Sequence, residues 1–214
     1  MLKRPDSVQL ATLFWILEPN RVLLGMKKRG FGVGKYNGFG GKVQADETPL
    51  QGALRELQEE CGLIPIDTRP RGILLFEFVE PDKRWYLEVH LYSATKFTGN
   101  VTESEEMRPE WFAYPDVPHG KMWEDDKYWW PILMRDSNFL GHFVFDNSQL
   151  LSRGLVRECP SIPARFPRPR STWPQGIPPT DADVDHPFPD PPLERVVRCE
   201  SITPGVPTET HPIP

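Results

Sequence analysis

The stretch from Gly41 to Leu63 constrains the chain more than any other segment, because it predicts both a helix and a cluster of acidic side chains. Thr48 can cap the helix, Pro49 suits its first position, and Gln51 can reach back to the cap. Gly62 is the residue type that ends a helix in the left-handed conformation, so the helix should finish just before it. Apolar positions recur at helical spacing and predict one buried face, formed by Leu50, Ala53, Leu54, Leu57 and Cys61.

Three carboxylates, those of Glu56, Glu59 and Glu60, fall on a neighbouring face of this predicted helix. Carboxylates crowded on one turn repel one another unless a cation offsets their charge. Mg²⁺ prefers oxygen ligands and is usually shared between a few carboxylates and substrate phosphates, where it neutralises charge and activates water. The pattern therefore favours a Mg²⁺ site for phosphoanhydride cleavage. The alternative, which any single glutamate would favour, is a solvated acidic helix face.

Two further features indicate a ligand site beside the helix. Gly40 and Gly41 allow the backbone to pass close to a ligand, because no Cβ obstructs the approach. Arg55 can hold a neighbouring carboxylate in place through a bidentate ion pair. Both features fit a site in which a loop and a helix share one ligand.

The segment follows the pattern G-x5-E-x7-R-E-U-x-E-E-x-G-U, with U a bulky aliphatic residue, at every defined position. This pattern resembles the signature of the Nudix hydrolases. The resemblance covers about the first 159 residues, through the segments RVLLGMKKRGFG, YNGFGGKVQ, FEF, EMRPEWF and MWEDDKYW. These segments are similar to the branch of the family that hydrolyses oxidised purine nucleoside triphosphates.

The resemblance implies a metal site and assigns its candidate ligands, which are Gly41, Glu56, Glu59, Glu60 and Glu106. One of the glutamates in this set would orient or deprotonate the attacking water. Glu47 and Arg55 would position the segment, and they complete the candidate catalytic set. An alternative interpretation of Glu106 is that it lies in an exposed acidic loop without a role in the site, because Glu side chains are commonly exposed.

The same resemblance implies a site for the substrate, formed by Thr12, Lys27, Phe31, Asn37, Gly40, Gly41, Phe76, Trp123, Asp125 and Asp126. The residue types suit a purine, because Trp123 offers a broad aromatic face and Asn37 both donates and accepts. Asp125 and Asp126 in a partly apolar pocket would raise each other's pKa, so that one is protonated and can donate. Such a pair could read both an oxidised guanine and an oxidised adenine. The alternative is a solvated turn or a helix cap.

Elsewhere, apolar runs predict strands at 8–17, 21–28, 73–79, 85–96, 110–113, 141–146 and 155–158, and a second helix at 127–135. This mixed order of strands with two helices favours the α+β class. The family resemblance narrows the class to the Nudix fold, a mixed β-sheet sandwiched between α-helices. His90 and His142 are interpreted as strand residues, because neither belongs to a cluster with metal-ligand spacing.

Composition divides the chain at residue 160. Of the 25 prolines, 15 lie at or beyond Pro160, in a stretch without sustained apolar periodicity. We therefore expect a Nudix hydrolase domain over residues 1–159 and a Pro-rich, disordered tail over residues 160–214. The tail carries no motif specific enough to name a partner.

The net charge of −5 gives no footprint for nucleic-acid or membrane-surface binding. No segment has the roughly 20 consecutive apolar residues of a membrane span. Cys61, Cys159 and Cys199 are widely spaced, which indicates neither a disulfide framework nor a zinc site and fits a reducing compartment. We expect a cytoplasmic monomer whose partner is a small nucleotide. The sequence leaves a nuclear or mitochondrial fraction open.

The activity implied by the resemblance is Mg²⁺-dependent hydrolysis of oxidised purine nucleoside triphosphates, such as 8-oxo-dGTP and 2-hydroxy-dATP, to the monophosphate and pyrophosphate. This activity would sanitise the nucleotide pool and limit mutation. One alternative is a Nudix hydrolase of another nucleoside diphosphate derivative, such as a dinucleotide or an ADP-sugar. A second alternative, from a different class, is a nucleotide-binding protein without turnover.

Overall fold

A computed structural model describes residues 7–80, 83–146 and 149–166 of the chain. The tail predicted from residue 160 therefore lies, beyond residue 166, outside the described residues. The elements are β1 (Ser7–Leu17), β2 (Arg21–Lys27), β3 (Tyr36–Asn37), α1 (Pro49–Cys61), β4 (Ile64–Pro65), β5 (Arg69–Glu80), β6 (Lys83–Ala94), β7 (Phe97–Thr98), β8 (Met107–Ala113), the 3₁₀ turns η1 (Tyr114–Asp116) and η2 (His119–Lys121), α2 (Asp126–Met134), β9 (Phe139–Asp146) and β10 (Gln149–Glu158). Among the helices of the described part, none is long and apolar enough to cross a membrane.

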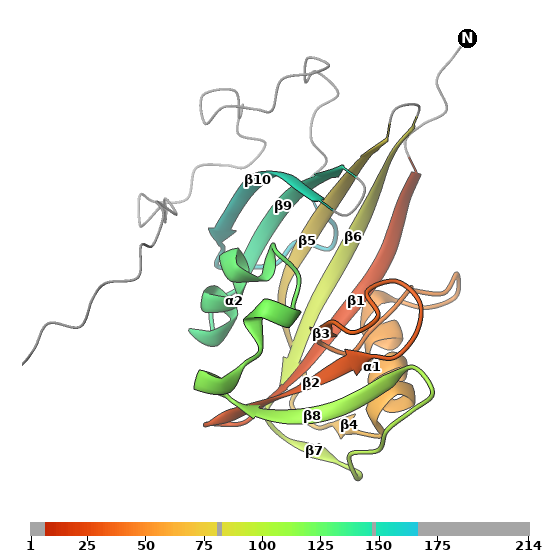
Figure 1. The fold of residues 1–214 in the computed structure, drawn as a ribbon, viewed down its shortest axis with the longest axis vertical. Coiled ribbons are helices and arrows are strands. Elements are labelled where there is room, and N and C mark those ends of the chain that lie inside the picture. The colour runs from red at the N-terminus through yellow and green to blue at the C-terminus, as the bar shows by residue number, and fades with distance from the viewer. Residues whose placement is uncertain (1–6, 81–82, 147–148, 167–214) are drawn as a thin grey trace, which may run out of the picture.

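A mixed sheet forms the body of the protein, with eight strands in the order β10-β9-β5-β6-β1-β2-β3 and β8 paired to β2. β1 runs parallel to β6 and β5 runs parallel to β9, whereas β5 and β6 are antiparallel. The helices α1 and α2 pack on opposite faces of the sheet (Figure 1). This arrangement confirms the expected α+β class, with a mixed sheet between helices.

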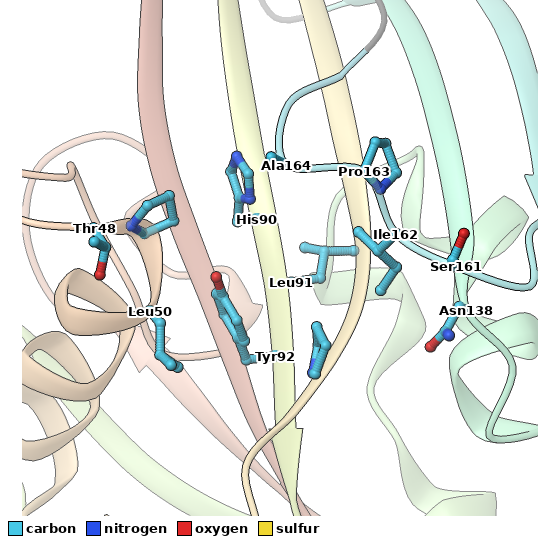
Figure 2. A pocket seen from close by; sticks show the side chains of 13 residues that line it. Thr48, Leu50, His90, Leu91, Tyr92, Asn138, Ser161, Ile162, Pro163 and Ala164 are labelled. Carbon is cyan, nitrogen blue, oxygen red and sulfur yellow. The ribbon is translucent and has the colours of Figure 1, made fainter. Parts of the chain in front are cut away.

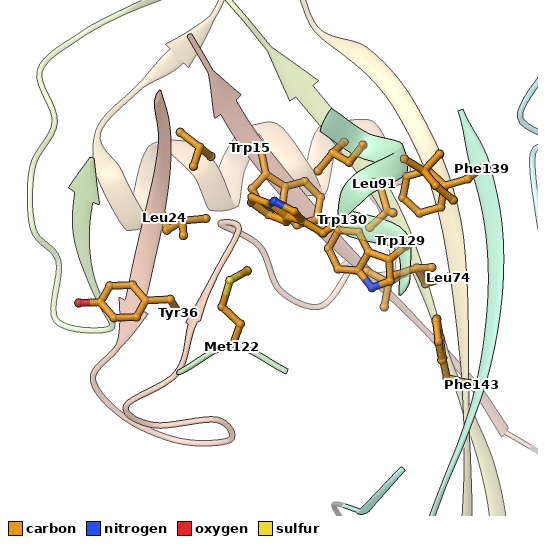
Figure 3. Packing of buried hydrophobic residues seen from close by; sticks show 14 of the residues in the cluster. Trp15, Leu24, Tyr36, Leu74, Leu91, Met122, Trp129, Trp130, Phe139 and Phe143 are labelled. Atoms are coloured by element: carbon orange, nitrogen blue, oxygen red, sulfur yellow. The ribbon is translucent and has the colours of Figure 1, made fainter. Parts of the chain in front are cut away.

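Strand β1 supplies both hydrophobic cores, because alternate side chains of a strand face opposite sides of its sheet. Phe14 packs with Leu57 of α1 in one core. In the other core, Trp15 packs against Trp129 and Trp130 of α2, with ring centroids 5.4 and 6.5 Å away (Figure 3). Each large apolar side chain buried in this way contributes about 2 to 3 kcal/mol. The two cores fix both helices relative to the central strands.

Helix α1 begins and ends as its sequence predicts. The Thr48 hydroxyl accepts from the backbone N–H of Gln51, and the Gln51 side chain accepts from the Thr48 N–H at 2.8 Å. Gly62 closes the helix with φ of 75°, a left-handed conformation that glycine adopts without strain. The predicted apolar stripe was wrong at Leu50, which is 41% exposed, because the side chains buried on this face of the helix begin one turn later, at Ala53.

Several strands extend beyond their predicted limits. β5 begins at Arg69 and β8 at Met107, in both cases before the apolar run that indicated the strand. Arg71 is buried in β5, where its guanidinium donates to the carbonyl of Leu133 at 3.0 Å and pairs with Asp136. The charged Arg71 breaks the apolar pattern of the sequence. The strand continues through it because a distant segment supplies its hydrogen-bond partners.

Candidate active site

Arg55, on α1, organises the carboxylates at the exposed edge of the candidate active site. Its guanidinium binds Glu47 through two nitrogens, Nε at 2.5 Å and Nη2 at 3.0 Å. Its Nη1 donates to Glu56 at 2.9 Å and to Glu59 at 3.1 Å. The hydrogen bond from Arg55 holds the pKa of Glu47 below its usual value. Glu47 and Arg55 therefore connect the loop before α1 to the acidic face of the helix.

Glu60 lies deeper than the other acidic residues of α1 and is only 4% exposed. Its carboxylate accepts from the Gly40 N–H at 2.8 Å and lies 3.6 Å from the Lys27 ammonium. Burial raises the pKa of Glu60 to about 7, and the charges of Glu56 and Glu106 add to that rise. Periodicity placed Glu60 on the face shared with Glu59, but the Gly40 loop covers it.

Glu106 comes directly before β8 and joins the same site through Lys27, which also lies close to Glu60. It pairs with Lys27, and Arg29 Nη2 lies 3.4 Å from its carboxylate. The hydrogen bond from Lys27 lowers the pKa of Glu106. In contrast, burial raises the pKa of Glu56, with further increases from the charges of Glu59 and Glu106. The glutamates of α1 and Glu106 are thus close enough to influence one another's charge.

The donor set suits a hard divalent cation. Within residues 7–80, 83–146 and 149–166, no three acidic, His or Cys side chains converge into a ready metal cage, and Glu56, Glu60 and Glu106 are each paired with a cation or a backbone N–H. A Cβ at Gly41 would lie 2.6 Å from Glu56 Oε1, so the loop packs directly on a carboxylate oxygen. Half-buried carboxylates with raised pKa values and mutual repulsion are groups that a divalent metal would stabilise.

Two aromatic side chains of the candidate base pocket, Phe31 and Trp123, lie stacked on each other. Phe31, on the Gly-rich loop, stacks on Trp123 with ring centroids 4.9 Å apart and an interplanar angle of 21°. Phe31 remains 71% exposed, so one of its faces is open to solvent. Asn37 lies in β3, and its Oδ1 accepts from the Gly38 N–H at 2.8 Å. The Asn37 amide nitrogen is the group of this side chain that remains available to donate.

Asp125 and Asp126 are buried at the start of α2, each 3% exposed. Asp125 accepts from the Trp129 indole N–H at 2.9 Å, and Asp126 accepts from the Trp123 backbone N–H at 3.2 Å. Burial raises the pKa of Asp125 to about 6, and it raises the pKa of Asp126 well above the usual value, assisted by the charge of Asp125. The alternative of a solvated turn or cap is wrong, because both side chains are buried and Asp125 caps no backbone N–H.

Two further predicted pocket residues come from the central strands. Thr12 of β1 is buried, and no described group hydrogen-bonds its Oγ1. Phe76 of β5 stacks on Phe143 with centroids 5.8 Å apart, and it is paired across the sheet with Leu87 of β6. The predicted substrate residues therefore come from six separate parts of the chain, namely β1, the end of β2 with the Gly-rich loop, β3, the loop of Gly40 and Gly41 after it, β5, and the segment leading into the start of α2.

Two residues that sequence reasoning did not assign to the site take part in it. The ring of Trp129 is buried in the core, and its indole N–H also donates to Asp125. The four-residue spacing from Asp125 to Trp129 along a helix was a usable signal. Lys35 binds the Met122 carbonyl at 3.1 Å, and no local sequence pattern indicates this contact between distant segments.

A cavity of about 490 Å³ lies apart from these residues (Figure 2). It opens between the first turn of α1, the strand residues His90 and Tyr92, and the segment Ser161–Ala164. None of the predicted site residues lines it.

His90 and His142 are strand residues, as expected, and their rings bind the buried carboxylates of Glu88 at 2.9 Å and Glu77 at 3.1 Å.

Comparison with known proteins agrees with this geometry. A profile of the NUDIX domain family matches residues 8–131. The oxidized purine nucleoside triphosphate hydrolase of Mus musculus is 49% identical over 158 residues, which cover 73% of this chain and 99% of that protein. The protein of the same name from Danio rerio is 46% identical over 143 residues, covering 67% of this chain and 90% of its own length.

Solved structures show the same fold. The crystal structure of the mutator MutT protein from Bacillus halodurans matches with a TM-score of 0.62 at 27% identity, covering 72% of this chain and 99% of that chain. A NUDIX hydrolase from Nitrosomonas europaea shares the fold with a TM-score of 0.50 at 16% identity, over 67% of this chain and 82% of its own. Nudix hydrolases generally act with a divalent metal, in keeping with the carboxylates around Arg55 and Lys27. The chain belongs to the Nudix hydrolase family.

Proposed function

We propose that this protein hydrolyses oxidised purine nucleoside triphosphates to the nucleoside monophosphate and pyrophosphate, with Mg²⁺ as the metal and the monomer as the active form. The observation that carries the choice of substrate is the buried Asp125–Asp126 pair, whose Asp126 accepts from the backbone N–H of Trp123. The names of the mouse and zebrafish relatives support the same class of substrate.

The aspartate pair suits a modified purine because the two carboxyl groups favour different protonation states. Burial and mutual repulsion favour one proton on the pair near neutral pH. A protonated carboxyl donates, an ionised carboxyl accepts, and Asn37 can supply a further donor. Phe31 stacks on Trp123 and is exposed on its other side, and that open face would stack on the purine ring. This pocket can satisfy a purine edge that carries both donors and acceptors, as in 8-oxo-dGTP or 2-hydroxy-dATP.

At the phosphate end, Glu56, Glu59, Glu60, Glu106 and the Gly41 carbonyl would hold the metal. When bound, Mg²⁺ would neutralise phosphate charge and lower the pKa of a coordinated water. Arg55 keeps the acidic residues of α1 in position through its contacts with Glu47 and Glu56. Lys27 lies between Glu60 and Glu106, where its ammonium can contact an anionic substrate group. One of the site glutamates would accept the proton of the attacking water.

The test is steady-state hydrolysis by the purified full chain with Mg²⁺, using 8-oxo-dGTP, 2-hydroxy-dATP, dGTP and ADP-ribose and detecting monophosphate and pyrophosphate. A strong preference for the two oxidised triphosphates is the expected result. Turnover of ADP-ribose alone would support the proposed metal site and contradict the proposed base pocket. Tight nucleotide binding without hydrolysis of any substrate would overturn the enzymatic proposal in favour of a binding protein.

A further inference from the structure

Lys35 follows the Gly-rich loop of residues 30–34 and is half-buried. Its N–H donates to the Gly32 carbonyl at 3.0 Å, and its carbonyl accepts from the Lys27 N–H at 2.9 Å. From this fixed backbone, the side chain crosses to the segment before α2, where its ammonium donates to the Met122 carbonyl at 3.1 Å. The side chain therefore joins the two segments that carry the stacked aromatic side chains of the base pocket.

The same ammonium lies over the Trp123 ring, 5.0 Å from its centroid. A cation in this position is attracted to the indole face and limits rotation of the ring. The Trp123 backbone N–H in turn donates to Asp126 at 3.2 Å. The contacts are thus continuous from Lys35 through Trp123 to the aspartate pair.

Two charged neighbours act on the aspartate pair. Glu124 opposes ionisation of Asp125, and Lys35 favours ionisation of both aspartates. Lys127 is adjacent to Asp126 in sequence, but its ammonium lies over the Tyr128 ring at 5.0 Å. The charge of the Lys35 ammonium therefore acts on both members of the pair.

We propose that Lys35 is a positioning residue of the base pocket, whose ammonium fixes the Met122–Trp123 segment and retains negative charge on the Asp125–Asp126 pair. The charge state decides which edge of a purine the pair can read, because an ionised carboxylate only accepts whereas a protonated carboxyl also donates. The consequence for substrate choice rests on the proposed function. The effect on the aspartates belongs to the free protein and can be measured without substrate.

The test compares the wild-type protein with Lys35→Met, which keeps the length and apolar stem, and with Lys35→Arg, which keeps the charge. Lys127→Met is the matched control, since it removes a neighbouring ammonium that acts on Tyr128. Carboxyl-carbon NMR of ¹³C-labelled aspartate gives the pH midpoints of Asp125 and Asp126 in the full chain. In Lys35→Met both midpoints should move to higher pH, by about one pH unit, the lower end of the effect of a neighbouring opposite charge. Lys35→Arg and Lys127→Met should keep the wild-type midpoints.

Unchanged midpoints in Lys35→Met would overturn the proposal, whatever the enzyme hydrolyses. If Lys35→Met does not fold, Lys35→Gln serves as the neutral variant in the same titration. The pH profile of kcat/KM for the oxidised triphosphates should move to higher pH in the neutral variant and return with Lys35→Arg, with a larger change in KM than in kcat. A shifted titration in a protein whose wild type shows no preference for oxidised purines would refute the proposed function and leave the charge role of Lys35 in place.

Discussion

The protein has two acidic centres, the glutamates around α1 and the aspartate pair at the start of α2. They differ in how their negative charge is stabilised. At the α1 centre, Arg55 and Lys27 hold the carboxylates through direct ion pairs. At the α2 centre, Asp125 and Asp126 make no ion pair among the described contacts and accept only from the neutral N–H groups of Trp129 and Trp123. The first centre is arranged for multiply charged ligands, and the second keeps a proton.

The difference shows that raised carboxyl pKa values have different uses in the two centres. Burial is the largest cause of the rise for Glu60 and for Asp125. Around Glu60, further carboxylates and cations share the space, so a metal can replace the paired cations. Asp125 and Asp126 accept from tryptophan N–H groups and form no described ion pair, so a proton adds to the positive charge that Lys35 supplies. The environment rather than the residue type separates a metal ligand from a hydrogen-bond donor.

The largest expected effect separates the two centres directly. Glu60→Gln removes a buried carboxylate from the metal site, and we expect kcat to fall by about a thousandfold, comparable to the loss of one electrostatic stabiliser of a transition state. Binding of an oxidised nucleoside monophosphate, measured by calorimetry, should change little, because the base pocket is intact. Glu105→Gln, at an exposed neighbour of Glu106, is the control and should keep full activity. Full turnover by Glu60→Gln at saturating Mg²⁺ would contradict the metal role.

The next prediction concerns a substitution in the base pocket, Asp125→Asn, which leaves the metal site intact. Asp125→Asn keeps the shape and the acceptor for Trp129 but removes the titrating carboxyl. We expect the ratio of kcat/KM for 8-oxo-dGTP over dGTP to fall by about 10- to 100-fold, the value of one hydrogen bond to a charged group. Asp116→Asn, at an exposed position in η1, is the control. An unchanged ratio in Asp125→Asn would show that the aspartate pair does not read the base.

The aspartate pair should also make stability depend on pH. Its folded pKa values are raised, to about 6 for Asp125, so the fold favours the protonated form. This stability is fully present below the unfolded pKa of about 4 and is lost as the pH rises through the folded values. Asp126→Asn stays neutral, so its melting temperature should equal that of the wild type near pH 4. Above pH 7 the melting temperature of Asp126→Asn should exceed that of the wild type, because the wild-type pair loses its proton there while the amide stays neutral.

Thermal melts of both proteins across this pH range provide the measurement. The direction of the stability change with pH distinguishes a buried, protonated carboxyl from a carboxylate in an ion pair. A protein stabilised by such an ion pair loses stability as the pH falls. A variant that is less stable than the wild type above pH 7 would indicate that Asp126 is ionised and favourably paired in the folded protein.

The smallest expected effect concerns a buried carboxylate outside both centres, that of Glu88 in β6. Arg165, in the segment after β10, donates to it at 2.8 Å. Arg165 and Arg135 have equally exposed side chains, both 53%, but the partner of Arg165 is 4% exposed and the partner of Arg135, Glu158, is 44% exposed. Arg165→Ala should therefore lower the stability by up to about 1 kcal/mol, and Arg135→Ala by less. Denaturant unfolding of the two variants makes the comparison, and equal losses would show that burial of Glu88 is not decisive.

Local sequence patterns predicted much of the fold. The first helix begins and ends where Thr48, Pro49 and Gly62 indicated, because capping depends on residues within one turn of the helix end. The second helix and the main strands were also placed by periodicity. The strand limits were less accurate, since Arg71 is accommodated by contacts with Leu133 and Asp136 that lie far away in sequence.

Identification of the candidate site residues depended on the sequence pattern and on the tertiary structure. Spacing alone identified Glu56 and Glu60 as members of one acidic cluster, because both follow from a single helix. Whether Asp125 and Asp126 are buried could not be decided from WEDDK, since adjacent aspartates are usually exposed. The family resemblance pointed to a partly apolar site for the pair, and both carboxylates are buried in the structure.

The sequence by itself determined the capped helix, its acidic face and the family, because each depends on residue types at short, fixed spacings. Only the tertiary structure decided that Glu60 is covered by the Gly40 loop, that Trp129 binds Asp125, and that Lys35 reaches Met122. Such contacts join segments whose distance apart is set by the packing of both helices against the sheet. The protonation behaviour of a carboxyl group follows from those neighbours, and a linear pattern of residues does not contain them.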